Sequence, residues 1–185
     1  HLPDYYAAVQ YVLADLIADG LLPRKLRVLD VGAGVGGPAL GLADLVPEDA
    51  LVEYHAVEPS AATDVLSAML EETGRNFRTT IHETSAEEFE PDGEYDLLLF
   101  SNVLSELDDP ASVVDRYREA LAADGSLVAL APADRETAIG LREVERAAED
   151  GLTVYAPTVR LWPNATPTDE GWSFDVQSDL EPPGF

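Results

Sequence analysis

Glycines follow a short apolar stretch near the N-terminus in a spacing that lets the main chain approach a ligand. Residues 26–31 have the apolar character of a strand, and Gly32, Gly34 and Gly37 then follow in the order Gly-x-Gly-x-x-Gly. Because glycine adopts backbone conformations closed to other residues, such a turn brings backbone N–H groups against a bound molecule. The turn therefore predicts a ligand site where a strand gives way to a helix.

The residues after the last glycine narrow the choice of ligand. A triphosphate-binding loop of the Walker type needs a lysine and a hydroxyl residue there, but Gly37 is followed by Pro38 and Ala39. A nucleoside triphosphate is therefore not expected. A dinucleotide such as NAD and another adenosine-containing cofactor both remain open.

Two carboxylates flank the turn and bear on that choice. Glu58 ends the next apolar stretch, at the spacing from which a carboxylate accepts hydrogen bonds from both ribose hydroxyls of an adenosine cofactor. Asp30 stands shortly before Gly32, where its charge would repel a pyrophosphate and attract an ammonium group. The pair favours an adenosine cofactor that carries an amino group over NAD.

The turn and the carboxylates must be positioned by alternating strands and helices. Asp109 is expected to cap a helix that has Pro110 at its first position, and Ser60 to cap another. Asp124 and Gly125 are expected to turn the chain into a strand. We expect helices at 4–19, 37–46, 60–73, 110–122 and 133–149. We expect strands at 26–31, 51–57, 77–81, 95–100, 126–130, 152–161 and 171–176.

This order predicts the fold class. Strands that alternate with helices form parallel sheets, whereas the last two strands have no helix between them and should pair antiparallel. The sequence therefore predicts an α/β fold, doubly wound around a mainly parallel seven-stranded sheet with a terminal antiparallel strand.

The composition bounds what else the chain can be. Its 185 residues, 46% of them hydrophobic, suit a single domain over residues 1–185. No apolar run approaches the length of a membrane span and no signal peptide is visible, so we expect a cytoplasmic protein. The absence of cysteine excludes disulfides, thiolate metal sites and cysteine nucleophiles, and no metal is expected.

Acidic residues outnumber basic ones along the whole chain. There are 36 aspartates and glutamates against 11 lysines and arginines, a net charge of -25. A dispersed acidic surface of this kind resembles the halophilic proteins of salt-loving archaea, in which molar salt screens the self-repulsion. It also disfavours a simple nucleic-acid-binding role, because a phosphate backbone normally attracts a basic surface.

Four stretches taken together resemble the class I S-adenosylmethionine-dependent methyltransferases. "VLDVGAGVG" is similar to the first motif of that family and "YHAVEPS" to its second. "YDLLLFSNVLSEL" resembles the fourth strand with the segment after it, and "ALAADGSLVAL" resembles the approach to the fifth strand. The resemblance implies a Rossmann-like methyltransferase fold with an N-terminal helix or lid (1–22), a cofactor-binding core (26–131) and a C-terminal helix and strand pair (132–185).

The resemblance also implies roles for single residues. Gly32 and Gly34 would let the backbone approach the methionine part of S-adenosylmethionine, and Asp30 would help to fix its amino group. Glu58 would hold the ribose. Ser85 and Ala86 lie where the family often has an Asp-Ala pair that reads the adenine. The implied cofactor-binding set is Asp30, Gly32, Ala33, Gly34, Glu58, Pro59, Ser85, Ala86, Ser101 and Asn102.

The segment after the fourth strand is implied to face the reacting methyl group, and the first helix to lie over the cofactor. Ser101 and Asn102 leave that strand beside the acceptor and are the candidate catalytic residues. Tyr5 or Tyr6 could close over the cofactor.

Missing residue types narrow the methyl acceptor. Without cysteine, covalent chemistry at pyrimidine C5 is excluded. The Asn/Asp-Pro-Pro-aromatic motif of exocyclic-amine methyltransferases would fall at 101–104, where Ser-Asn-Val-Leu stands. Lysine-assisted ribose 2′-O methylation needs two lysines, and Lys25 is alone. His55 and His82 occupy strand positions, where histidine is more often structural than catalytic.

A finer resemblance concerns "NVLSEL", "GSLVALAPAD" and "VYAP". These stretches resemble a methyltransferase-like family linked to assembly of the small ribosomal subunit. That family commonly carries cysteines for an iron–sulfur cluster after the last stretch, and this chain has none. The arginines that could touch RNA, or instead pair with carboxylates, are Arg135, Arg142, Arg146 and Arg160.

We therefore expect a methyltransferase that uses S-adenosylmethionine and acts on ribosomal RNA or a ribosomal particle. Methyl transfer to a small molecule and a non-catalytic, cofactor-binding role in ribosome assembly remain open. An open rim lined by arginines would favour RNA, whereas a lid built from the first helix and the 163–170 loop would favour a small molecule. An NAD-dependent reductase is a more distant alternative.

Overall fold

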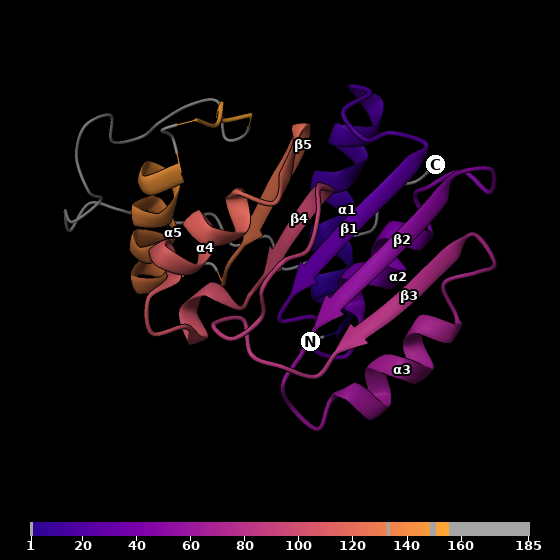
Figure 1. Cartoon of the computed structure of the whole chain (residues 1–185), viewed down its shortest axis with the longest axis horizontal. Helices are drawn as coiled ribbons and strands as arrows, with labels where there is room; N and C mark the ends of the chain where they lie inside the picture. The colour runs from indigo at the N-terminus through magenta and orange to yellow at the C-terminus, as the bar shows by residue number, and fades with distance from the viewer. Residues whose placement is uncertain (1, 133, 149–150, 156–185) are drawn as a thin grey trace.

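The computed structural model describes residues 2–132, 134–148 and 151–155, in which helices cover both faces of a five-stranded sheet (Figure 1). The strands are β1 (Lys25–Val31), β2 (Leu51–Val57), β3 (Phe77–His82), β4 (Tyr95–Ser101) and β5 (Leu121–Leu130). The helices are α1 (Leu2–Ala18), α2 (Gly37–Ala43), α3 (Thr63–Glu71), the short 3-10 helix η1 (Leu104–Glu106), α4 (Pro110–Arg118) and α5 (Arg135–Ala148).

The order of the strands fixes where a ligand can bind. All neighbouring strands run parallel in the order β3-β2-β1-β4-β5. The chain moves outward from β1 to β3 and then crosses to β4, so the strand order reverses between β1 and β4. Open parallel sheets bind ligands beyond the carboxyl ends of their strands at such a reversal. The glycine turn follows β1 and Ser101 ends β4, so both lie at this place.

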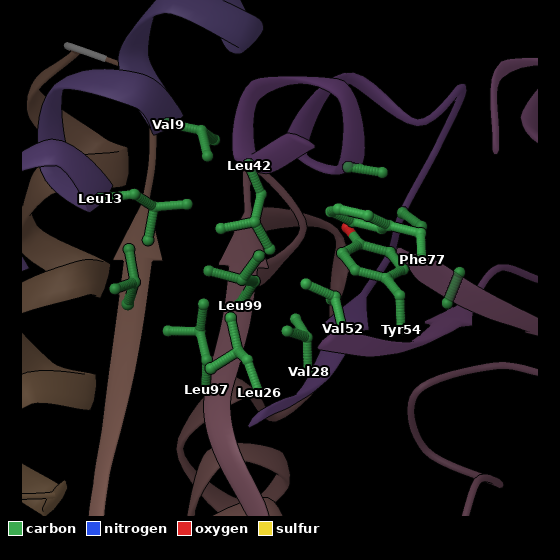
Figure 2. Close-up of a cluster of buried hydrophobic side chains, with 14 of the residues drawn as sticks. Val9, Leu13, Leu26, Val28, Leu42, Val52, Tyr54, Phe77, Leu97 and Leu99 are labelled. Atoms are coloured by element: carbon green, nitrogen blue, oxygen red, sulfur yellow. The ribbon is translucent and has the colours of Figure 1, made fainter. Parts of the chain in front are cut away.

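Two apolar clusters hold the sheet between its helical layers. One face packs against α1, α2 and α3, and Figure 2 shows part of this cluster, including Val9, Leu13, Leu42 and Leu99. The opposite face packs against α4 and α5. β4 supplies both clusters in alternation, because successive side chains of a strand point to opposite faces. This explains why its sequence, Tyr-Asp-Leu-Leu-Leu-Phe-Ser, is almost wholly apolar.

The predicted elements of the core are confirmed, with corrections at their ends. Asp109 caps α4 as predicted, accepting a hydrogen bond from the Ser112 backbone N–H at 3.1 Å. The helix ends at Arg118, however, and β5 already begins at Leu121. The predicted turn at Asp124-Gly125 is wrong. Those residues lie inside β5, where the register against β4 shifts between Tyr95 and Leu97, and such a bulge absorbs the turn residues without ending the strand.

The predicted cap at Ser60 is also wrong. α3 begins at Thr63, and the Ser60 hydroxyl accepts a hydrogen bond from the Ala62 N–H in the turn before the helix. Ser60 is held there because its own N–H donates to Glu58. The helix also ends at Glu71 rather than near Thr73, whose hydroxyl turns back onto the Leu70 carbonyl.

The last two predicted strands fall largely outside the described residues. Residues 151–155 are described and form no strand, and the 171–176 strand and its antiparallel pairing lie wholly beyond them. No helix in the described ranges is both long and apolar enough to cross a membrane.

Candidate functional site

The glycine turn is held against the end of β2 by backbone hydrogen bonds. The N–H groups of Gly32 and Ala33 both donate to the Val57 carbonyl, at 2.8 and 3.1 Å. Gly32 and Gly34 have φ angles of 70° and 56°, the left-handed region that glycine enters without steric cost. Gly36, also left-handed, stands at the N-terminus of α2. The glycines are thus required by the path of the turn itself.

Glu58 joins this turn to the segment that follows β2. One oxygen of its carboxylate accepts from the Gly34 N–H at 2.8 Å, and the other accepts from the Ser60 N–H at 2.9 Å. The side chain is largely buried. An ionised carboxylate has about four acceptor positions, so two backbone donors leave capacity for the hydroxyls of a ligand. Pro59, between the two contacts, is exposed at the same edge.

Asp30 lies beneath the turn and is wholly buried. Its Oδ2 accepts a hydrogen bond of 2.6 Å from the Tyr54 hydroxyl on β2, and its Oδ1 has no hydrogen-bond partner in the described residues. The pKa of Asp30 is raised to about 7, because burial and the Glu58 charge raise it more than the Tyr54 hydrogen bond lowers it. The sequence indicated a carboxylate beside the turn, but not that its side chain would be sealed from solvent.

The segment after β4 closes the other side of the turn. A Cβ placed on Gly32 would lie 2.4 Å from Val103 Cγ2, so Val103 packs directly on that glycine. Asn102 has a φ of 63°, and its N–H donates to the Leu130 carbonyl at 2.9 Å. Asparagine is the non-glycine residue most often found in this left-handed region. Its amide is 3.4 Å from the Ser101 hydroxyl, to which it donates.

Ser85 and Ala86 follow β3, and α4 anchors Ala86. The Ser85 hydroxyl accepts from the Glu88 N–H at 3.3 Å, which forms a local turn. The Ala86 carbonyl accepts from the Tyr117 hydroxyl at 2.9 Å and from Arg116 Nη2 at 2.5 Å. The β3 end is tied in turn to the Glu58 segment, since the Glu58 N–H donates to the His82 carbonyl at 3.0 Å. The predicted adenine-reading pair therefore lies along the same sheet edge.

Several other predicted candidates are used elsewhere in the fold. The Tyr6 hydroxyl donates to Asp44, at the end of α2 remote from the glycine turn. His55 and His82 stack on each other with ring nitrogens 3.0 Å apart, and His55 also contacts Glu53 at 2.8 Å. Burial lowers the pKa of His82. Within the described ranges no group of His, Asp or Glu is arranged to hold a metal ion.

The arginines proposed for RNA are largely engaged or outside the described side chains. Arg142 pairs with Glu145 on α5, and Arg146 also has a partner. The side chain of Arg135 and the whole of Arg160 lie outside the described part. Arg142 and Arg146 are therefore not free to line a rim for RNA.

The sequence matches the family described as "methyltransferase domain" (Methyltransf_23) over residues 5–175. The chain belongs to the methyltransferase domain family. The match supports this general family. It does not support the finer resemblance to a ribosome-assembly family. No curated protein matches the chain.

Solved structures share the fold of this methyltransferase domain. An O-methyltransferase described as putative, from Nostoc punctiforme, is 25% identical, with a TM-score of 0.52, covering 65% of this chain and 35% of its own. Coclaurine N-methyltransferase bound to N-methylheliamine and SAH is 18% identical, with a TM-score of 0.51, and the match covers 63% of this chain and 34% of that enzyme. A plantazolicin methyltransferase in complex with a desmethylPZN analogue and SAH is 14% identical (TM-score 0.53; 66% and 44%). The chain spans less than half the length of each.

Two residues of the methyltransferase domain site are not among those predicted from the sequence. Tyr54 supplies the hydroxyl bound to Asp30, and Val103 covers Gly32. The β2 alternation places Tyr54 on one face with Val52 and Ala56, but only the pairing of β2 with β1 brings that face beside Asp30. Nothing in the sequence placed Val103, since its contact depends on how the chain leaves β4.

The two glycines of the turn should respond differently to alanine. Both substitutions force a left-handed backbone, at about 1–2 kcal/mol, but only alanine at 32 meets Val103, whereas nothing lies within 4 Å of a Cβ at 34. Gly32→Ala should therefore lower the unfolding free energy further, by about 1–3 kcal/mol of added overpacking. Denaturant unfolding of both variants in molar KCl measures this. Equal losses would contradict the Val103 contact.

The buried Asp30 predicts a pH-dependent stability difference. Its folded pKa of about 7 lies above the ordinary aspartate value of 3.8, so its contribution to stability is present at low pH and is lost as pH rises through about 7. Asp30→Asn removes this titration. The unfolding free energy of the variant minus that of the wild type should rise by up to about 1.4 kcal/mol per pH unit from about pH 5 to 7 and then level off. A difference independent of pH would show that Asp30 titrates normally.

Proposed function

We propose that this methyltransferase domain binds S-adenosylmethionine and transfers its methyl group to a small-molecule or peptide acceptor. The observation that carries the cofactor is the arrangement around the turn. Glu58 and Asp30 place two carboxylates beside half-buried glycines, and open space surrounds the Cβ position of Gly34. The unpaired buried Oδ1 of Asp30 supports a cationic ligand, because a buried acceptor without a donor is costly.

The residues present fit that cofactor. Glu58 would accept from the ribose hydroxyls while it holds Gly34 and Ser60, and the turn from Gly32 to Gly34 would lie along the methionine part. Ser85 and Ala86 would line the adenine. S-adenosylmethionine, when bound, supplies a methyl group on a sulfonium that an acceptor takes by in-line displacement, which needs alignment more than acid or base chemistry. The solved structures crystallised with SAH, S-adenosylhomocysteine, support the same choice.

Ser101 and Asn102 are the residues that would align the acceptor. They leave β4 at the strand-order reversal, and the left-handed Asn102 turns the chain so that Val103 faces the glycine turn. Their hydroxyl and amide groups can orient an acceptor nitrogen or oxygen by hydrogen bonds. Neither is a strong base, which suits a nucleophile that reaches the site in its reactive form.

The charge distribution favours a small or peptide acceptor over RNA. The net charge is -25, and five of the described arginines pair with carboxylates: Arg24 with Asp49, Arg27 with Glu53, Arg116 with Glu90, Arg118 with Asp115 and Arg142 with Glu145. At low ionic strength a polyanion is repelled by such a surface, and molar salt weakens that repulsion. Coclaurine N-methyltransferase and plantazolicin methyltransferase, which share the fold, are named for acceptors other than RNA.

Calorimetric titration with S-adenosylhomocysteine and with NAD, in molar KCl, tests the cofactor. We expect S-adenosylhomocysteine to bind and Glu58→Gln to weaken it by about ten- to hundred-fold, because the new amide turns a donor toward backbone N–H groups and loses ribose contacts. Glu48→Gln, the same change at an exposed position before β2, serves as the control and should bind normally. Binding of NAD alone would overturn the proposal.

Transfer of a labelled methyl group from S-adenosylmethionine tests the acceptor class. Small amines, hydroxy compounds and short peptides should become labelled, while ribosomal RNA and ribosomal particles should not, because electrostatic repulsion opposes their approach. Label on ribosomal RNA would contradict a small-molecule or peptide acceptor and would indicate a ribosomal acceptor instead. Tight cofactor binding without transfer to any acceptor would instead indicate a non-catalytic binding protein.

A further inference from the structure

Asp30 and Tyr54 form a closed pair under the glycine turn. Neither side chain has exposed surface. The Tyr54 hydroxyl donates to Asp30 Oδ2 at 2.6 Å, from the strand next to β1, while Asp30 Oδ1 is left without a partner. Charged hydrogen bonds of this length are among the stronger ones in proteins. The hydrogen bond therefore fixes Oδ2 of Asp30, and Oδ1 is left to interact with a ligand.

Tyr54 belongs to an apolar cluster, and one further charge acts on Asp30 among the described residues. The ring of Tyr54 lies beside Phe77, with centroids 6.3 Å apart, inside the cluster formed with α1, α2 and α3 (Figure 2). Glu58, after β2, is the other titratable group that acts on Asp30. A charge in such surroundings is weakly screened. Two nearby carboxylates then favour a cation at the turn.

We propose that Tyr54 is a positioning residue whose hydroxyl holds the Asp30 carboxylate in its charged form, so that the free oxygen attracts the ammonium group of the cofactor through the glycine turn. This inference rests on the proposed function. The carboxylate acts from beneath the turn, since it has no exposed surface. Its charge, rather than a solvent-facing contact, is what the amino group of the ligand would detect.

The hydroxyl of Tyr54 matters because burial works against the charge. Burial raises the pKa of Asp30 to about 7, and the Tyr54 hydrogen bond is the influence that lowers it. Phenylalanine at 54 would keep the ring and its packing but remove the donor. Asp30 would then take up a proton at a higher pH, and near neutrality the attraction to an ammonium group would weaken.

The test compares two ligands on the wild type and Tyr54→Phe. S-adenosylhomocysteine carries the ammonium group, whereas 5′-methylthioadenosine keeps the adenosine and the sulfur but lacks the amino acid part. If the loss of the hydroxyl raises the pKa by about one unit, Kd for S-adenosylhomocysteine should increase by about five- to ten-fold at about pH 6.5 and by less than about twofold at about pH 9. Because the ligand titrates equally in both measurements, its titration cancels in the ratio of the Kd of the variant to the Kd of the wild type. Kd for 5′-methylthioadenosine should not change with the variant at either pH.

Control variants separate this effect from a packing defect. Tyr95→Phe removes another buried hydroxyl, which donates to Asp92 and belongs to the opposite face of the sheet, and should leave both affinities unchanged. In an Asp30→Asn background, Tyr54→Phe should alter the affinity for S-adenosylhomocysteine by less than about twofold at every pH. The reason is that Tyr54 acts through the charge of Asp30, which asparagine lacks. A pH-independent loss for both ligands would overturn the positioning role.

A measurement on the wild type keeps the inference testable should Tyr54→Phe not fold. Carbon-13 signals of the Asp30 carboxyl and of Tyr54 Cζ should shift together at one pH midpoint. S-adenosylhomocysteine should lower that midpoint, whereas 5′-methylthioadenosine should not. Independent midpoints would overturn the inference. Failure of both ligands to bind would refute the proposed function itself, whereas normal binding with no effect of Tyr54 would refute only the inference.

Discussion

The hydrogen bond between the Gly34 N–H and the Glu58 carboxylate joins the ends of β1 and β2, and the rest of the site depends on it. It fixes the glycine turn against the next strand, together with the two N–H groups bonded to Val57. The same carboxylate sets the path after β2 through Ser60. The end of β3 is tied to Glu58 by its backbone. One residue, through its side chain and its backbone, therefore aligns three strand ends at the edge where the strand order reverses.

This arrangement carries an electrostatic cost. Asp30 is wholly buried and Glu58 largely buried close to the turn, and the Glu58 charge disfavours the charged form of Asp30. Backbone donors stabilise Glu58 and a tyrosine hydroxyl stabilises Asp30, but the unpaired oxygen of Asp30 is left without compensation. A positively charged ligand relieves that imbalance, and a polyanion does not. The excess of acidic residues elsewhere acts in the same direction over longer distances.

Much of the fold was predictable because its signals are local. The strand over 51–57 and the Asp109 cap match the structure, since apolar runs and capping chemistry act within a few residues. The ends of elements were less predictable. Asp124 and Gly125 have the composition of a turn, yet pairing with β4 keeps them inside β5 as a shift of register. Ser60 resembles a helix cap, but its N–H is bound to Glu58 and the helix begins later.

The sequence by itself determined the chemistry that the site contains. It supplies glycines able to adopt a left-handed backbone, a carboxylate before and after the glycine turn, and an acidic chain without cysteine. These are properties of residue types and of short intervals. Only the tertiary structure decided that Tyr54 contacts Asp30, that Val103 covers Gly32, and that Tyr6 bonds to Asp44 at the end of α2. Each of these contacts joins elements distant in sequence. Their partners are selected by strand order and packing, which no local pattern of residues records.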